Sequence, residues 1–271
     1  MSSECVLRYS LLTTNMTPLD SIPPFIPAFL LVFFRLTGLF LFAPVFGSNV
    51  IPRRVKTLLA LVLTFCIFPI VAPASPVQLT MPVFAVTVGT ELLIGIIIGY
   101  GASIPLVAMQ VGGQLIGQQL GLGLAQIFNP DFNEESEVVS QLLFMVALVL
   151  FLLINGHHLL LTALIHSFHN VPLGGVIEPG HVLNFILGLL QAMFELGLRV
   201  GAPLLCMIFL ETVAMGFVAR TVPQLNILTL GFPLRIMIGF LLLIGVCSLL
   251  FTSINDAFRN MFMQLMQLFT T

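Results

Sequence analysis

Charged residues are scarce in this sequence, and their scarcity excludes a soluble globular fold. Only 7% of the 271 residues are Asp, Glu, Lys or Arg, while 58% are hydrophobic. A soluble domain carries about 25% charged residues. Residues 57–90, 92–130 and 138–177 contain none of the four charged types. Because a membrane-spanning helix needs about 20 apolar residues, each run is long enough to cross a bilayer, and the sequence predicts a polytopic membrane protein.

Basic stripes, paired cysteines and catalytic motifs are also lacking. The net charge of -2 and the absence of a basic stripe argue against binding to nucleic acid. Cys66, Cys206 and Cys247 lie in apolar segments without CxxC spacing, so we interpret them as small core residues. The sequence has no HExxH, GxSxG or P-loop, and its five histidines match no familiar zinc spacing. We therefore expect no enzyme, no cofactor and no metal site.

Apolar segments separated by proline and glycine predict an all-α fold of kinked helical hairpins, forming one membrane domain over residues 1–271. We expect helices over about 25–46, 57–71, 83–109, 138–154, 182–219 and 234–253. Pro203 should kink the fifth of these helices. The tail, 256–271, is predicted to be an amphipathic helix. Its apolar face comprises Phe258, Met261, Phe262, Leu265, Leu268 and Phe269.

Four ionisable residues lie within predicted apolar helices: Arg35, Glu91, Glu195 and Glu211. A charge at the bilayer centre costs about 2.5–3.5 kcal/mol, so these side chains should face protein or water. Arg199 follows Glu195 by four residues, a spacing that permits an ion pair along one helix. We predict a buried charge pair there, with a role in helix packing. Glu91 and Glu211 have no obvious partner in the sequence, which leaves a role in a wet interior open.

The stretch 110–130 is uncharged but rich in glycine and glutamine. On a helix, a smooth face of Gly113, Gly117 and Gly121 would lie beside a polar face of Gln110, Gln114 and Gln118. Lipid does not tolerate unpaired amides, so this segment should face protein or a water-filled cavity. Each glycine lowers helix stability by about 1 kcal/mol. Two alternatives stay open, namely a re-entrant or movable segment and a tightly packed helix pair.

Four blocks follow one another over nearly the whole chain. They are FFRLTGLFLFAPVFGSNVIPRRVK (33–56), ELLIGIIIGY (91–100) with the Gly/Gln run up to Asn129 and Pro130, NGHHLLLTALIHSF (155–168) and ARTVPQLNILTLGFPLR (219–235). The last block is the most specific. Together they resemble the FliR family of flagellar export proteins and its injectisome relatives.

The resemblance implies a subunit that assembles with FliP- and FliQ-like subunits into a helical hetero-oligomeric export gate. That gate would lie in the bacterial inner membrane at the flagellar basal body, meet FlhB and FlhA, and pass unfolded flagellar proteins. In FliR-like proteins a glycine-rich loop helps plug the closed pore, and here it maps onto residues 110–128. The plug candidates are Gln110, Gly113, Gln114, Leu115, Ile116, Gly117, Gln118, Gln119, Gly121 and Phe128.

A secondary transporter for a small solute is the alternative function. Transporters also use broken helices and carboxylates near the middle of the membrane. They commonly show two related halves, however, and no internal repeat is visible in this sequence. A transporter should be intact alone, whereas an export-gate subunit should be unstable without its partners.

Overall fold

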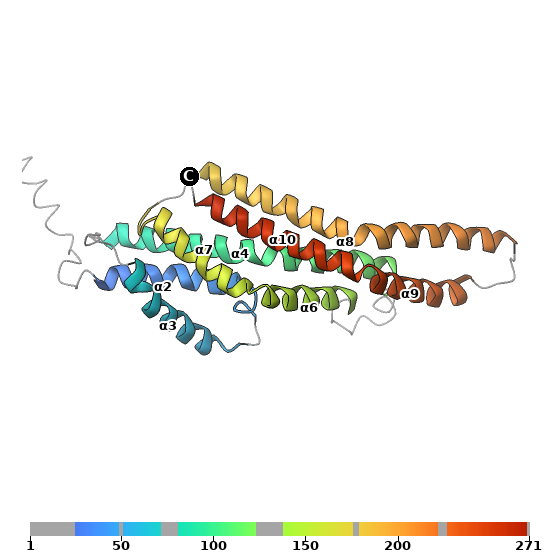
Figure 1. Ribbon diagram of the computed structural model, residues 1–271, viewed down its shortest axis with the longest axis horizontal. Coiled ribbons are helices and arrows are strands. Elements are labelled where there is room, and N and C mark those ends of the chain that lie inside the picture. Colours follow the sequence, from blue (N-terminus) through green and yellow to red (C-terminus); the bar gives the residue numbers. More distant parts are fainter. Residues whose placement is uncertain are drawn as a thin grey trace, which may run out of the picture. The chain divides into compact units, whose positions relative to one another are not determined.

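A computed structural model describes residues 25–48, 51–71, 81–122, 138–175, 179–221 and 227–269. The regular structure of these residues is all α-helical, which confirms the predicted fold class (Figure 1). The helices are α2 (Phe25–Phe42), α3 (Arg53–Val71), α4 (Met81–Gln119), α6 (Val138–Leu153), α7 (Gly156–Asn170), α8 (Pro179–Thr221), α9 (Ile227–Gly245) and α10 (Cys247–Leu268).

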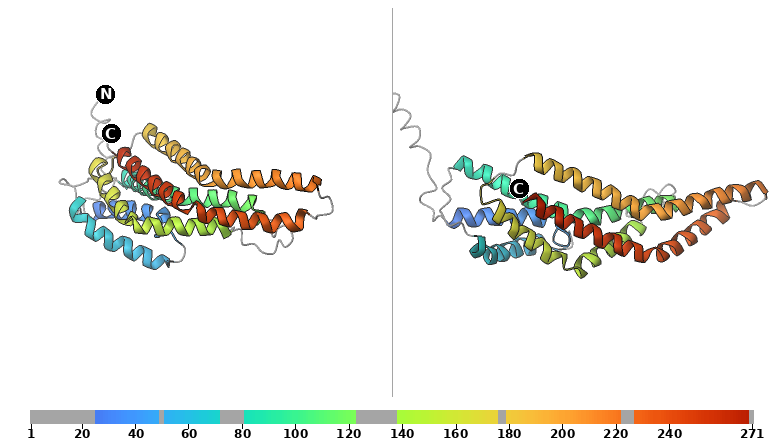
Figure 2. Two further views of the ribbon diagram at one scale, coloured as in Figure 1. Left: turned by 45° about the vertical axis from the view of Figure 1, so that its right-hand side comes forward. Right: turned by 45° about the horizontal axis from the view of Figure 1, so that its top comes forward.

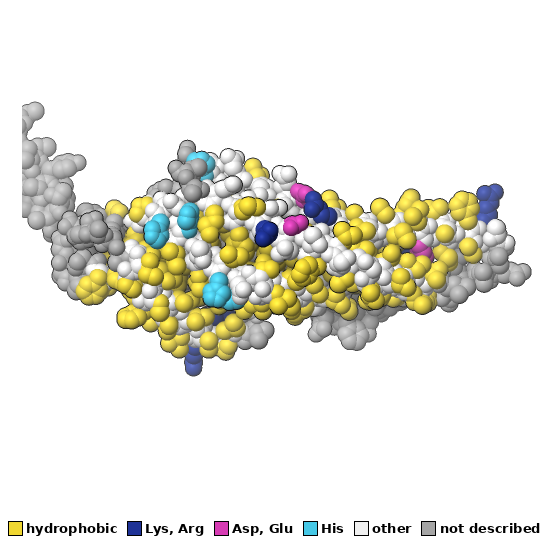
Figure 3. Space-filling view, in the orientation of Figure 1, with side chains coloured by type: hydrophobic (Ala, Val, Ile, Leu, Met, Phe, Trp, Pro, Cys, Tyr) yellow, Lys and Arg dark blue, Asp and Glu magenta, His cyan; other side chains and the backbone are white. Residues whose placement is uncertain are grey.

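Among the described residues, α2, α3, α4 and α8 are long and apolar enough to cross a membrane. The bent pairs α6–α7 and α9–α10 raise the number of possible spans to six if each pair is one span. Apolar side chains predominate on the face shown in Figure 3, where ionised side chains are few. The polytopic membrane character predicted from composition is therefore confirmed.

Several helix ends differ from those expected. Helix α4 continues past the expected end at Met109 to Gln119, so the glycines of this stretch do not interrupt it. Helix α8 is continuous from Pro179 to Thr221, with Pro203 inside it. The single helix expected over 234–253 is wrong, because α9 and α10 meet at Val246 with a bend of 58°. No proline marks that break in the sequence.

Contacts divide the chain into two compact units, which we describe separately. Unit 1 consists of Met1–Gly101, His158–Val182 and Leu265–Thr271, and unit 2 of Ala102–His157 and Leu183–Gln264. Unit 1 therefore holds α2, α3, the first half of α4 and nearly all of α7. Unit 2 holds the rest of α4, with α6, α9 and most of α8 and α10. Assignment of the whole chain to one functional domain remains a prediction.

In unit 1, helices α2 and α4 approach each other at backbone distance, and α3 lies beside α2 (Figure 2). A Cβ atom on Gly38 would overlap the carbonyl oxygen of Leu92, and one on Gly95 would overlap that of Arg35. Gly99 approaches the backbone of α2 in the same way. Small residues allow membrane helices to pack this closely. These glycines therefore set the distance between the two helices.

In unit 2, the second half of α4 packs against α6 and α8. A Cβ atom on Gly113 would lie 2.6 Å from the Cα of Ser140, and one on Gly112 would lie 3.1 Å from the carbonyl oxygen of Gly197. Oγ of Ser140 also donates a hydrogen bond of 3.0 Å to the carbonyl oxygen of Gln110. Residues 110–119 are therefore a helix packed against α6 and α8 through Gly112 and Gly113.

The amphipathic tail is confirmed as the C-terminal part of α10. All six residues of its predicted apolar face are buried: Phe258, Met261, Phe262, Leu265, Leu268 and Phe269. Arg259, Asn260 and Gln267 are exposed on the opposite side. Within unit 2, α10 and α9 run along α8 (Figure 2). The ring of Phe258 contacts that of Phe151 on α6, with 5.5 Å between the ring centres.

Candidate functional site

Arg35 and Glu91 form a fully buried ion pair in unit 1. Nε of Arg35 donates to Oε2 of Glu91 over 2.5 Å, and both side chains are 0% exposed. Nη1 donates to Oγ of Ser167 over 3.1 Å, and Nη2 donates to the carbonyl oxygen of Val171 over 3.2 Å. Each nitrogen of the guanidinium group therefore has an acceptor. Sequence reasoning found neither the partner of Glu91 nor the role of Ser167.

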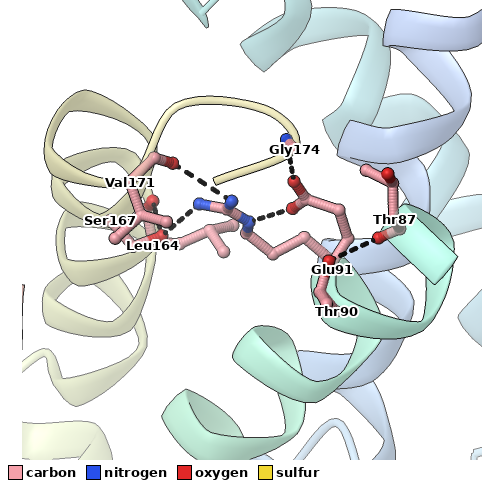
Figure 4. Close-up of polar contacts among 8 residues, drawn as sticks. Thr87, Thr90, Glu91, Leu164, Ser167, Val171 and Gly174 are labelled. Carbon is pink, nitrogen blue, oxygen red and sulfur yellow. Dashed lines mark hydrogen bonds and ion pairs between the residues drawn. The ribbon is translucent and has the colours of Figure 1, made fainter. Parts of the chain in front are cut away.

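The same cluster fixes the turn that follows α7. Oε1 of Glu91 accepts a hydrogen bond of 3.1 Å from the backbone N–H of Gly174. Gly174 has a φ of 82°, a conformation that favours glycine. Figure 4 shows Ser167 and Val171 on one side, Glu91 on the other and Gly174 above them. The ring of Phe168 covers the guanidinium group, with 4.1 Å from Cζ of Arg35 to the ring centre.

This cluster joins helices that are far apart in the sequence. Arg35 comes from α2, Glu91 from α4, and Ser167 from α7. A buried ion pair is favourable only when further hydrogen bonds support it. Here each guanidinium nitrogen and both carboxylate oxygens have a partner. No group of three His, Cys, Asp or Glu in the described part of the chain could hold a metal ion. We assign the cluster to positioning of helices.

Glu211 has a partner that sequence reasoning also missed. Nε of Arg235 on α9 donates to Oε2 of Glu211 on α8 over 3.1 Å. The carboxylate is 6% exposed and the arginine side chain 30%. Nη2 of Arg235 donates to Oγ1 of Thr212 over 2.9 Å. The sequence feature that could have indicated a partner is the scarcity of charged residues. A lone carboxylate in an apolar helix requires a cation or another donor nearby.

The predicted pair of Glu195 and Arg199 forms, with 2.9 Å from Nη2 to Oε1. Its predicted burial is wrong for this chain, because the two side chains are 59% and 58% exposed. An i, i+4 pair lies along the surface of its own helix, and here more than half of each side chain is exposed. A small cavity of about 100 Å³ lies beside the pair, lined from α10 by Asp256, Asn260 and Gln264 among others.

The plug candidates fall into three groups. Gly113, Ile116 and Gly117 are buried on α4, and Leu115 is partly buried. Gln110, Gln114, Gln118 and Gln119 are exposed on the same helix, so the two predicted faces exist. Gly121 lies in the turn that ends the helix, and Phe128 lies outside the described residues.

The end of α4 has a specific capping geometry. The N–H of Gly121 donates to the carbonyl oxygen of Gln118 over 3.0 Å, and that of Leu122 to the carbonyl oxygen of Gly117 over 3.2 Å. These two bonds, with Gly121 at a φ of 77°, form a Schellman motif. Gly121 therefore ends helix α4 within the candidate plug segment.

The interpretation of three cysteines as core residues is wrong. Cys66, Cys206 and Cys247 are free and exposed on α3, α8 and α10. They lie in apolar segments as expected, but on faces that the rest of the chain does not cover. The apolar composition of these segments predicted membrane helices correctly. It did not indicate which face of each helix packs against the rest of the chain.

Comparison with known proteins identifies the family. The family model of bacterial export proteins, family 1, matches residues 26–261. The flagellar biosynthetic protein FliR of Bacillus subtilis (strain 168) is 30% identical over 243 residues, which are 89% of this chain and 93% of that protein. FliR of Escherichia coli (strain K12) is 33% identical over 232 residues, 84% of this chain and 87% of that protein.

A third relative is more distant. FliR of Aquifex aeolicus (strain VF5) is 28% identical over 243 residues, 88% of this chain and 92% of that protein. The residues of all three ion pairs described above lie within the matched range 26–261. The chain belongs to the FliR family of bacterial export proteins.

Proposed function

We propose that this chain is a non-enzymatic core subunit of the flagellar type III protein-export gate. With FliP- and FliQ-like subunits it forms a channel for unfolded flagellar proteins during flagellum assembly. The gate lies in the bacterial inner membrane at the basal body, next to FlhB and FlhA. Membership of a family of flagellar biosynthetic proteins carries this proposal and favours it over a transporter of small solutes.

Helices left uncovered by the chain support assembly with other subunits. Only 17% of the most apolar window is buried within the chain in α3, and the same fraction in α8. The C-terminal part of α8 exposes Phe209, Leu210 and Phe217, which lipid or protein could cover. Glu195 and Arg199 are exposed on the same helix, and ionised groups are unfavourable against lipid. Neighbouring subunits would cover the apolar surface of α8, and a water-filled channel would solvate its ion pair.

Purification in mild detergent tests the assembly. The chain should be extracted from cells that contain the FliP- and FliQ-like proteins and from matched cells that lack both. We expect co-purification in the first case, and degradation or polydisperse material in the second. A monodisperse, well-folded monomer from the second cells would contradict the proposal.

We also propose that the segment 110–128 closes the channel at rest. It carries no charged side chain, so packing and hydrogen bonds to its own uncharged groups would hold it, and a passing chain could displace it. Within the described residues, the exposed row of Gln110, Gln114 and Gln118 offers amides to water or to a neighbouring backbone. The helical part ends at the turn around Gly121, which is where displacement of the segment would begin.

A deletion tests the plug. Replacement of residues 121–128 by a short Gly/Ser linker leaves the packing of Gly113 on Ser140 untouched. We expect an assembled complex that makes the membrane leaky to small ions, measured as conductance or solute uptake. Co-purification of the partner subunits controls for assembly. An assembled deletion complex that stays sealed and exports normally would contradict the plug.

A further inference from the structure

The C-terminal end of α4 is held from α9 by two residues one helical turn apart, Arg235 and Gly239. Nη1 of Arg235 donates to the carbonyl oxygen of Gln119 over 3.5 Å. Gly239 makes room for the side chain of Leu120, since a Cβ atom there would overlap the Cδ2 atom of Leu120. Leu120 is only 1% exposed. Helix α9 therefore contacts the end of α4 in two ways: Arg235 donates a charged hydrogen bond to Gln119, and Gly239 accommodates the side chain of Leu120.

The hydrogen bond from Arg235 extends the cap of α4 by one carbonyl group. The last four carbonyl groups of a helix lack partners within it. Here the Schellman motif satisfies those of Gly117 and Gln118. The carbonyl of Gln119 is the next one, and the Nη1 of Arg235 reaches it. A cation at this position also interacts favourably with the negative end of the helix dipole.

Arg235 is itself fixed by α8. Its Nε and Nη2 donate to Glu211 and Thr212 over 3.1 and 2.9 Å. The planar guanidinium group therefore connects three helices with three different nitrogens. Lysine cannot replace it, because a single ammonium group on a flexible stem lacks this fork of donors. The geometry requires arginine rather than any cation.

We propose that Arg235 is a positioning residue. Together with Gly239 it forms a latch on α9 that fixes the C-terminal end of α4, and hence the point at which the helical part of the segment 110–128 ends. The expected effect of the latch on sealing of the channel rests on the proposed plug. Its contacts with α4 do not depend on that proposal. The latch breaks when Leu120 leaves Gly239 and Gln119 loses its charged donor.

Hydrogen exchange of the purified, assembled complex tests the hold on α4. In Arg235→Lys, the positive charge near Glu211 stays but the three-way connection is lost. We expect faster amide exchange in the peptide covering residues 116–122. Gly245→Ala is the matched control, because it lies on the same helix and its new methyl group meets nothing within 4 Å. Unchanged exchange in Arg235→Lys would overturn the proposal.

A double variant tests the docking of Leu120. Gly239→Ala should displace Leu120 and speed exchange of the same peptide. In a Leu120→Ala background the overlapping atoms are gone, so Gly239→Ala should cause no further change. Equal effects of Gly239→Ala in both backgrounds would overturn the latch, because its action would then not pass through Leu120.

Leakage separates failure of the latch from failure of the plug. If the 121–128 replacement leaks, cells with Arg235→Lys should leak as well, and to a smaller extent. An Arg235→Lys complex that exchanges faster but stays sealed beside a leaking deletion would overturn the positioning role. If the replacement itself stays sealed, the plug proposal fails, and the exchange experiments alone decide on the latch.

Discussion

The buried pair Arg35–Glu91 and the exposed pair Glu195–Arg199 contain the same two chemical groups in opposite surroundings. The first joins residues 56 apart in the sequence and is 0% exposed on both sides. The second joins residues four apart on one helix and is more than half exposed. Around the first, Ser167, Val171 and Gly174 complete the hydrogen bonds. The second has one bond between its own two side chains.

The comparison indicates what a charge does in this apolar chain. Removal of one partner from a buried pair leaves an uncompensated charge, whereas an exposed partner is solvated. The pair Glu211–Arg235 lies between these limits, with a buried carboxylate and an arginine 30% exposed. We therefore expect the effects of mutation to follow burial rather than the length of the ion-pair bond.

The largest effect is expected at the buried pair. Arg35→Ala leaves Glu91 charged and without a cation, which costs about 3–5 kcal/mol. We expect loss of the chain from the membrane and of its complex on purification, measured by immunoblot and co-purification. Normal levels of Arg35→Ala would contradict the importance of burial.

A double variant provides the control for this prediction. Arg35→Met with Glu91→Leu removes both charges and keeps apolar volume, so most of the assembly should return. Recovery should be incomplete, because the N–H of Gly174 loses its acceptor. Restored assembly without export would instead indicate that the pair acts in export itself.

A smaller effect is expected where the two backbones meet. Gly95 lies one turn from Glu91, and a methyl group there would overlap the carbonyl oxygen of Arg35. Gly95→Ala should separate α2 from α4 and destabilise the fold by about 1–3 kcal/mol, the usual cost of overpacking. Gly89→Ala on the same helix is the control, because its Cβ meets nothing within 4 Å. Equal melting temperatures of the complexes with Gly95→Ala and Gly89→Ala would show that the close approach of α2 and α4 does not support the buried pair.

The predictable features of this chain are the local ones. Apolar runs and helical periodicity are properties of neighbouring residues, so the all-α membrane fold and the buried face from Phe258 to Phe269 followed from the sequence. The i, i+4 spacing likewise predicted the bond between Glu195 and Arg199. Its exposure depends on which helices cover α8, and spacing contains no information about that.

The features that sequence reasoning missed depend on distant residues. Arg35 was recognised as an unusual charge, but its partner lies 56 residues away on another helix. The end of α4 could not be placed, because glycine lowers helix stability locally while packing of Gly113 against Ser140 stabilises it. The role of Arg235 depends on a backbone carbonyl, which has no signature in the sequence.

The smallest effect is expected at the exposed pair. An i, i+4 pair in water contributes about 0.3–0.5 kcal/mol, so Arg199→Ala should barely lower the melting temperature of the assembled complex. The double variant with Glu195→Ala should match the sum of the two single variants to within that amount, since both partners are solvated when alone. Loss of the assembled complex in Arg199→Ala, as expected for Arg35→Ala, would break the comparison. It would mean that another subunit covers this face of α8 and keeps Glu195 dry, so that the stranded carboxylate bears the same desolvation penalty as Glu91.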